Sequence, residues 1–331
     1  MEKKQIVGVI GGGSWATAII KMLSENLTYI NWWIKNKDSV RHIKKHKHNP
    51  KYLSRTKLDL KKLNITSDIN DVVEKSDILI LAVPSVYLVE TMDLINLNIK
   101  NKIIISAIKG IVPTKNIVVG EYLNKNLNVP PENIGIITGP CHAEEIAMEQ
   151  LSYLTVAFLN TETSEAFSNL IKCKYVNTIV SDDVYGAEYS SVLKNVIAIA
   201  AGICSGLKYG DNFQAVLISN AIREIKKFID KYRPIHRDIN ESAYLGDLLV
   251  TCYSQYSRNR SFGEMIGRGR PVKKAMSELK MIVEGYYSVK CIHEINKNLG
   301  VNMPISTCVY NILYKNGNVK KEVEILTENL N

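Results

Sequence analysis

The sequence lacks several features that would place it in a specialised class of protein. Its 331 residues contain no unbroken apolar run of the roughly eighteen residues that cross a bilayer, so we expect no membrane span. The opening segment MEKKQIVGVIGGG carries no secretory cleavage pattern. Internal repeats and low-complexity linkers are also missing. We therefore expect a cytoplasmic globular protein of about two domains.

Clustered metal ligands and paired cysteines are missing as well. The six cysteines are scattered without a CxxC pair, at positions Cys141, Cys173, Cys204, Cys252, Cys291 and Cys308. This pattern excludes a disulfide framework and favours reduced, packed thiols. His42, His46 and His48 lie close together, but no carboxylate or cysteine accompanies them at a matching spacing. We predict no metal site.

Acidic residues are outnumbered by basic ones. The chain has 42 Lys and Arg against 33 Asp and Glu, which gives a net charge of +9. Such a balance suits an anionic partner: a nucleic acid, an acidic membrane or a small phosphorylated ligand. The excess is concentrated in residues 35–62, which lack the interleaved aromatic residues of a nucleic-acid stacking platform. We interpret this stretch as a solvated, mobile loop and expect no nucleic-acid partner.

Short apolar runs alternate with helix-length segments in the first half of the chain. They predict strands at 5–10, 28–34, 77–83, 102–108, 134–138, 154–159 and 175–180. Nearly continuous apolar runs of this kind are typical of buried parallel strands. After residue 180 the patterns are helical only, over 181–206, 212–231, 240–254, 261–267, 271–298, 304–315 and 318–330. The sequence therefore predicts an α/β fold with a Rossmann-type dinucleotide-binding domain over 1–180 and an all-helical substrate and catalytic domain over 181–331.

A glycine cluster joins the first predicted strand to a helix. The segment VIGGGSWATAI contains the pattern G-x-G-x-x-A at Gly11, Gly13 and Ala16. The first glycine permits a tight turn, the second lets a pyrophosphate approach, and the small third residue lets the helix pack against the strand. The free amides of the helix N-terminus then face the phosphates. The position of the motif between a strand and a helix predicts a dinucleotide site.

The end of the second predicted strand indicates which dinucleotide binds. Sites selective for NAD usually carry an acidic residue about 20 residues after the glycines, on the ribose hydroxyls. Here Lys35 and Lys37 occupy that place, and no acid precedes Asp38. The absence of a carboxylate at this position and the presence of two lysines favour NADPH, while NADH stays possible. The alternative is that both lysines are solvated surface residues.

The second half contains polar residues that a catalytic site would use. Lys194 lies inside a helix of small and apolar residues, where burial lowers a lysine pKa and makes the amine usable for proton transfer. Asp247 lies beside a glycine and could orient that lysine. The segment SRNR at 257–260 offers a guanidinium fork for a phosphate. The competing interpretations are a lysine that reaches solvent and a polar turn with a helix cap.

Several motifs together resemble a known enzyme family. They are GGGSWATA, AVPS (82–85), AIKG (107–110), TGPCHAEEIA (138–147), VLKNVIAI (192–199), LGDLLVTC (245–252), SRNR (257–260) and VEGYYS (283–288). In this order and spacing they resemble the bacterial-type NAD(P)-dependent glycerol-3-phosphate dehydrogenases over essentially the whole chain. The resemblance implies interconversion of dihydroxyacetone phosphate and glycerol 3-phosphate for glycerophospholipid synthesis. It also implies a homodimer.

The resemblance implies roles for individual residues. Lys194 would be the catalytic acid and base, supported by Asp247 and Lys109. Besides Gly11 and Gly13, the residues implied to bind the cofactor are Ser14, Trp15, Lys35, Lys109, Ala143, Arg258, Ile282 and Glu284. Those implied to bind or support the substrate are Lys109, Gly139, Cys141, Lys194, Asn195, Asp247, Thr251, Ser257, Arg258 and Asn259.

The chain departs from the family pattern at four positions. Cys141 stands where Thr or Ser is usual, which weakens a hydrogen bond to the substrate. Lys35 replaces Arg or His, Ala16 replaces the third glycine, and Tyr244 replaces a small residue. Two other functions stay open: a two-domain dehydrogenase of the β-hydroxyacid type acting on a carboxylate, and a dinucleotide sensor without catalysis. A carboxylate substrate instead of a phosphate would distinguish the β-hydroxyacid dehydrogenase from the family activity. The presence of acid/base residues argues against a sensor without catalysis.

Overall fold

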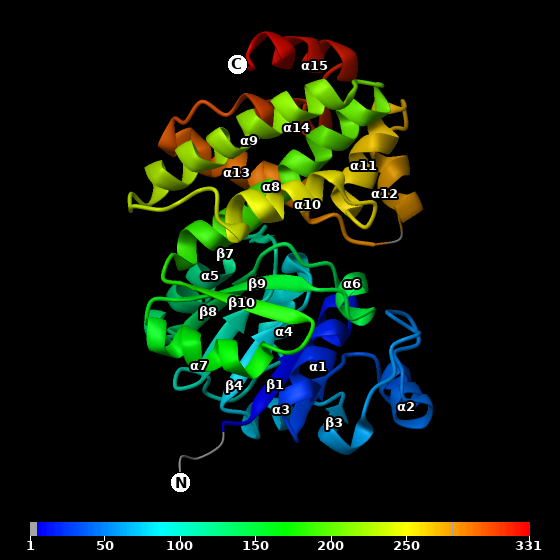
Figure 1. Cartoon of the computed structure of the whole chain (residues 1–331), viewed down its shortest axis with the longest axis vertical. Coiled ribbons are helices and arrows are strands. Elements are labelled where there is room, and N and C mark those ends of the chain that lie inside the picture. Colours follow the sequence, from blue (N-terminus) through cyan, green and yellow to red (C-terminus); the bar gives the residue numbers. More distant parts are fainter. Residues whose placement is uncertain (1–4, 280) are drawn as a thin grey trace. The chain divides into compact units, whose positions relative to one another are not determined.

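A computed structural model describes residues 5–279 and 281–331, which form two compact units (Figure 1). One unit, the sheet unit, contains the chain up to Ile108 together with Val119–Val184. The other, the helical unit, contains Lys109–Val118 and Tyr185–Asn331. The division into domains 1–180 and 181–331 stays a prediction, because compactness alone does not define a domain that folds by itself.

The sheet unit is built on eight strands in the order β10-β9-β8-β5-β4-β1-β2-β3. Their bounds are β1 Val7–Ile10, β2 Ile30–Trp33, β3 Leu63–Thr66, β4 Ile78–Leu81, β5 Ile103–Ser106, β8 Ile134–Thr138, β9 Ser152–Phe158 and β10 Val176–Ser181. Every neighbouring pair is parallel except β8 and β9. All seven predicted strands overlap observed ones, and the predicted Rossmann-type α/β class is confirmed.

Two details of the sheet differ from the prediction. Strand β3, which no apolar run predicted, is an edge strand with the sequence LNIT in which only Ile65 is buried. Strands β8 and β9 run antiparallel, although all strands were predicted to be parallel. An apolar run reports burial on both faces of a strand, and it does not report the direction of the neighbouring strand.

Helices flank both faces of this sheet. They are α1 Ser14–Asn26, α2 Lys37–His46, α3 Ile69–Glu74, α4 Leu88–Met92, α5 Val119–Leu127, α6 Ala143–Ala147 and α7 Thr161–Ile171, with short 3₁₀ turns at η1 Leu60–Lys62, η2 Ser85–Tyr87 and η3 Pro131–Asn133. Helix α1 packs on β1 and β2 and also contacts α6 and α7. Side chains alternate across each strand. Val7 and Val9 therefore join the apolar core with α1, whereas Gly8 lies against Val72 and Ser76 at the end of α3.

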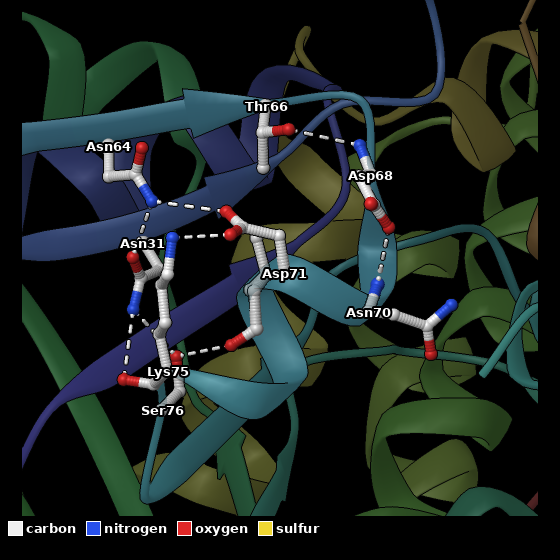
Figure 2. Close-up of polar contacts among 9 residues, drawn as sticks. Asn31, Asn64, Thr66, Asp68, Asn70, Asp71, Lys75 and Ser76 are labelled. Atoms are coloured by element: carbon white, nitrogen blue, oxygen red, sulfur yellow. Dashed lines mark hydrogen bonds and ion pairs between the residues drawn. The ribbon is translucent and has the colours of Figure 1, made fainter. Parts of the chain in front are cut away.

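A polar network occupies the face opposite α1, where β2 and β3 meet α3 (Figure 2). Asn31 of β2 is paired in register with Asn64 of β3 and accepts its amide hydrogen bond at 2.9 Å. The Asn31 amide donates to the Lys75 carbonyl at 3.2 Å and to the Ser76 hydroxyl at 3.0 Å. This buried asparagine is therefore fully engaged in holding the two strands to α3.

The basic segment 35–62 was predicted to be a mobile, solvated loop, and this is wrong for residues 37–46, which form α2. Asn36 caps that helix, its side-chain oxygen accepting from Ser39 N at 2.7 Å. Val40 and Ile43 are buried on its inner face. Only two apolar residues mark this face among many lysines and histidines, so the periodic signal is weak. In the described residues no group of histidine, cysteine and carboxylate side chains could hold a metal.

The helical unit contains a short hairpin and eight α-helices among its described residues. The hairpin joins β6 Ile111–Val112 to β7 Ile117–Val118. The helices are α8 Val184–Gly206, α9 Asp211–Tyr232, α10 Asp247–Tyr253, α11 Arg258–Gly267, α12 Val272–Leu279, α13 Glu284–Leu299, α14 Pro304–Tyr314 and α15 Val319–Glu328, with a π-helical turn η4 at Ser242–Gly246. The single helix predicted over 271–298 is thus two helices, because Val283 adopts an extended conformation before α13.

Helix α8 is the central helix of this unit. It is long and apolar enough to cross a membrane, but 89% of its most apolar window is buried in the protein, as in a core helix. Helix α11 packs closely on it: a side-chain carbon at Gly263 would lie 2.1 Å from the Ile199 carbonyl oxygen, and one at Gly202 would lie 2.0 Å from the Arg260 carbonyl oxygen. These glycines let the two backbones touch, and so they bring the start of α11 beside the middle of α8.

Candidate active site

The glycine-rich loop follows β1 and ends at the N-terminus of α1. Gly11 has φ +140°, and a side-chain carbon there would lie 2.4 Å from the Ala82 carbonyl oxygen, so the fold itself requires glycine. Gly13 differs, because its φ of −84° suits any residue and a side-chain carbon there would meet nothing within 4 Å. The packing of the protein therefore leaves open space at Gly13.

The N-terminus of α1 is suited to an anion. Its N-cap residue is Gly13, and no side chain caps the helix. The first amides of a helix have no partner inside the helix, and the helix dipole makes them attractive to negative charge. Ser14 and Trp15, both predicted to bind the cofactor, form the first two positions of this helix. Open space beside uncapped amides is the arrangement that a pyrophosphate needs.

Lys35 lies two residues after the end of β2 and is exposed. Its ammonium is 2.5 Å from the Glu90 carboxylate of α4, so a carboxylate balances part of its charge. Lys37 is the first residue of α2, and Asp38 pairs with Arg41 at 3.1 Å. No acidic residue follows β2 directly, as the sequence indicated.

Three more predicted residues of the sheet unit lie from the end of β8 to the start of α6. Gly139 has φ +110°, which a side chain would strain. Cys141 is buried, and Ala143 is the first residue of α6. Cys141 and Ala143 belong to the same apolar cluster as Ala16 of α1, so α6 is anchored beside the helix that carries the glycine loop.

In the helical unit, two lysines meet one carboxylate. Asp247 is the first residue of α10 and is 1% exposed. One of its oxygens pairs with the Lys194 ammonium of α8, and the other is 3.4 Å from the Lys109 ammonium. Lys194 is only 3% exposed. The structure therefore brings together the three residues predicted to carry out catalysis.

The environment of Lys194 sets its pKa. Burial lowers the pKa of this lysine, the attraction of Asp247 opposes that effect, and the positive charge of Lys109 adds to it. Together these effects bring the pKa of Lys194 to about 7. An amine with a pKa near neutrality exists in both protonation states at physiological pH. Lys194 can therefore both donate and accept a proton.

A chain of asparagine hydrogen bonds surrounds this cluster. Asn195 donates to the Lys109 carbonyl at 2.7 Å and accepts from the Asn259 amide at 2.8 Å. Asn259 in turn accepts from Gly285 N, at the start of α13, at 2.9 Å. Side chains from α8 and α11 thus fix the backbone that carries Lys109. Gly285 was missed by the sequence reasoning, although a glycine directly after Glu284 in VEGYYS was the available signal.

The segment SRNR lies at the start of α11, and its residues make different contacts. Ser257 caps the helix, its hydroxyl accepting from Arg260 N at 3.3 Å, which is the helix cap considered as the alternative to a phosphate contact. Arg258 is exposed and donates one hydrogen bond to the Ile282 carbonyl at 3.3 Å. Thr251 donates to the carbonyl of Asp247 at 2.6 Å and so steadies α10. Of these groups, the exposed Arg258 guanidinium is the one whose chemistry suits an anion.

Comparisons with known proteins extend over both units. The models of the N-terminus and of the C-terminus of NAD-dependent glycerol-3-phosphate dehydrogenase match residues 6–164 and 183–324. A curated glycerol-3-phosphate dehydrogenase (NAD(P)+) of Macrococcus caseolyticus is 34% identical over 322 residues, covering 97% of each chain. The one of Staphylococcus carnosus is 31% identical over 323 residues, again covering 97% of each chain. A crystal structure of glycerol-3-phosphate dehydrogenase from Coxiella burnetii has a TM-score of 0.90 at 26% identity, and it covers 98% of this chain and 99% of that one.

Proposed function

Because the chain belongs to the NAD-dependent glycerol-3-phosphate dehydrogenase family, we propose that its glycine-rich loop holds the dinucleotide and that its Lys194 cluster moves the proton. The protein interconverts dihydroxyacetone phosphate and glycerol 3-phosphate with a nicotinamide dinucleotide, and so supplies glycerol 3-phosphate for glycerophospholipid synthesis. The observation that carries the assignment of residues is the buried contact of Lys194 and Lys109 with Asp247. We also propose that the enzyme is a cytoplasmic homodimer, as the family resemblance implies.

The cofactor site fits a dinucleotide. Gly11, Gly13 and Ser14 offer a tight turn, open space and uncapped helix amides for the pyrophosphate. Trp15, Ala143, Ile282 and Glu284 are proposed to contact the rest of the cofactor. When bound, the dinucleotide supplies the hydride in reduction and accepts it in oxidation. We propose NADPH over NADH, because Lys35 and Lys37 follow β2 where a carboxylate would select NADH.

Lys194 handles the proton. In reduction its ammonium gives a proton to the carbonyl oxygen of the substrate, which becomes a hydroxyl, and the lysine is left as a neutral amine. In oxidation the amine takes that proton back. Asp247 holds the ammonium in place, while Lys109 adds positive potential where negative charge develops on the oxygen. One proton is consumed for each ketone reduced, and the pKa of about 7 lets Lys194 be recharged from solvent.

The start of α11 is proposed to hold the substrate phosphate. A guanidinium can bind two phosphate oxygens at once, and helix amides add further donors. Arg258 supplies the guanidinium, and Asn259, proposed as a substrate contact, lies beside it at the same helix end. Gly139, Cys141 and Thr251 stay proposed substrate contacts. Binding energy at the phosphate then orients the carbonyl group for reaction.

One assay tests this function. The purified protein should oxidise NADPH, and NADH less well, when dihydroxyacetone phosphate is added. Lys194→Ala should lower turnover by about two to four powers of ten while leaving dinucleotide binding intact, because a positioned acid or base contributes on that scale. The matched control is Lys102→Ala, since this half-buried lysine of the sheet unit donates to the Ser76 carbonyl at 2.6 Å and is not among the predicted site residues. Near-normal turnover in a folded Lys194→Ala variant would remove Lys194 from the mechanism.

A further inference from the structure

Asn49 is a buried polar residue that the mechanism does not use. It lies after α2 and is 1% exposed. Its amide donates to the Gly12 carbonyl at 3.1 Å and to the Thr17 hydroxyl at 3.0 Å. Its side-chain oxygen accepts from the backbone N of Lys51 at 3.1 Å and of Tyr52 at 3.2 Å. Both donors and both acceptor sites of the side chain are therefore occupied.

These bonds belong to a set that holds three successive carbonyl groups of the glycine loop. The Trp32 indole donates to the Gly11 carbonyl at 2.7 Å. Asn49 holds the next carbonyl, that of Gly12. The Thr17 hydroxyl donates to the carbonyl of Gly13 at 2.9 Å, in addition to the helical bond from Thr17 N at 3.0 Å. Each of the three carbonyls is thus tied to a buried side chain.

A fixed carbonyl also fixes the amide that follows it. A trans peptide unit is planar, so the C=O of one residue and the N–H of the next point in opposite directions. All described peptide bonds are trans. With the carbonyls turned toward Trp32, Asn49 and Thr17, the amides of Gly12, Gly13 and Ser14 point the other way. A glycine backbone is restrained less than that of other residues. The hydrogen bonds from Trp32, Asn49 and Thr17 therefore supply the restraint that fixes the peptide units of the loop.

We propose that Asn49 is a positioning residue of the dinucleotide site, which aims the Gly13 amide at the pyrophosphate. The inference rests on the proposed binding of the pyrophosphate at the glycine loop. Asn49 acts through the Gly12–Gly13 peptide and does not touch the cofactor itself. Thr17 supports it as the acceptor of its amide and as a second anchor of the loop.

Asn49→Asp separates the two halves of this side chain. The oxygen that accepts from Lys51 and Tyr52 is kept, while the amide that holds Gly12 becomes a second oxygen that repels the carbonyl. The dissociation constants of NADPH and NADH should both rise by the same factor, about tenfold or more. The reason is that the hydrogen bond from the Gly13 amide to the charged pyrophosphate is lost or misdirected. Turnover at saturating dinucleotide should stay within about twofold, because Lys194 is untouched.

The matched control is Asn31→Asp, which removes the same amide from another buried asparagine of the sheet unit (Figure 2). Asn31 bonds to Lys75 and Ser76 and not to the glycine loop. Asn31→Asp should therefore lower the urea midpoint of unfolding without changing the affinity for the dinucleotide. A milder pair keeps the test decisive if Asn49→Asp fails to fold: Thr17→Val should weaken dinucleotide binding several-fold, and Thr17→Ser should restore it.

Dinucleotide affinity is measured on the full chain by isothermal titration, with NADPH and NADH separately, beside turnover and urea unfolding. Unchanged affinity in folded Asn49→Asp, or an equal loss in Asn31→Asp, would overturn the inference. Gly13→Ala tests the premise independently, because the open space at Gly13 should keep the fold stable while an added methyl group blocks the pyrophosphate. If Gly13→Ala binds normally, the proposed pyrophosphate site fails. If Gly13→Ala weakens dinucleotide binding but Asn49→Asp does not, the pyrophosphate site stands and only the positioning role of Asn49 fails.

Discussion

Replacing Asp247 with asparagine removes the negative charge that lies between two lysines. The pKa of Lys194 is lowered to about 7, mainly by burial, and this value already includes the attraction of Asp247, the largest of the effects that raise it. Asparagine fills the same space without the charge, while the repulsion from Lys109 remains. The pKa of Lys194 should therefore fall well below 7 in Asp247→Asn.

The size of the shift follows from Coulomb's law. Two unit charges about 4 Å apart interact by about 4 kcal/mol at an effective dielectric constant near 20. One pKa unit corresponds to about 1.4 kcal/mol, so the pKa of Lys194 should drop by about 2 to 3 units. The protonated fraction at pH 7 would then fall from about one half to between about 1% and 0.1%. Reduction of dihydroxyacetone phosphate at pH 7 should slow by about 50- to 500-fold.

The assay is the pH dependence of kcat/KM in both directions. For reduction, the alkaline limb near pH 7 should move to lower pH in Asp247→Asn, so part of the lost rate returns on acidification. For oxidation of glycerol 3-phosphate, the acid limb should move the same way. Lys109→Met should shift both limbs to higher pH, because it removes a like charge from Lys194. A loss of rate independent of pH, or limbs that stay in place, would refute this account of the pKa.

Further outcomes are expected elsewhere in the molecule. Arg258→Ala should cost about 2 to 5 kcal/mol in kcat/KM for dihydroxyacetone phosphate and far less for unphosphorylated dihydroxyacetone; equal losses would favour a carboxylate substrate, and NADPH affinity serves as the control. Lys35→Asp should raise the KM of NADPH more than that of NADH, and Glu90→Gln should lower the KM of NADPH by freeing Lys35; equal effects on both cofactors would place Lys35 away from the 2′-phosphate. Burial raises the pKa of Glu224, whose carboxylate accepts three hydrogen bonds from the first turn of α14, from 4.5 to about 7. The folded protein then binds more protons than the unfolded chain between these values, so the free energy of unfolding should fall by about 3 kcal/mol as pH rises from 4.5 to 7. Glu224→Gln should abolish this slope in urea titrations, and a slope that persists would contradict the assignment.

The local signals in the sequence were reliable where one element carries the whole pattern. The glycine motif lies between a strand and a helix, as predicted, because the strand, the loop and the helix follow one another directly along the chain. The apolar runs likewise predicted seven strands, and the small residues of α8 predicted a buried helix ending at Gly206. The motif order then identified the family, and with it the lysine and aspartate that the structure brings into contact.

Tertiary structure decided what depends on contacts between distant segments. The pKa of Lys194 depends on burial and on two charges that lie 53 and 85 residues away in the chain. The hydroxyl of Ser257 caps α11, a contact that the sequence offered only as an alternative, and its contact with the substrate stays a prediction. Asn49 lies in a stretch whose lysines and histidines suggested a solvated loop, yet its amide reaches Gly12, 37 residues earlier. Composition and periodicity describe neighbours along the chain, whereas a hydrogen bond or an ion pair depends on which segments the fold brings within about 3 Å of one another.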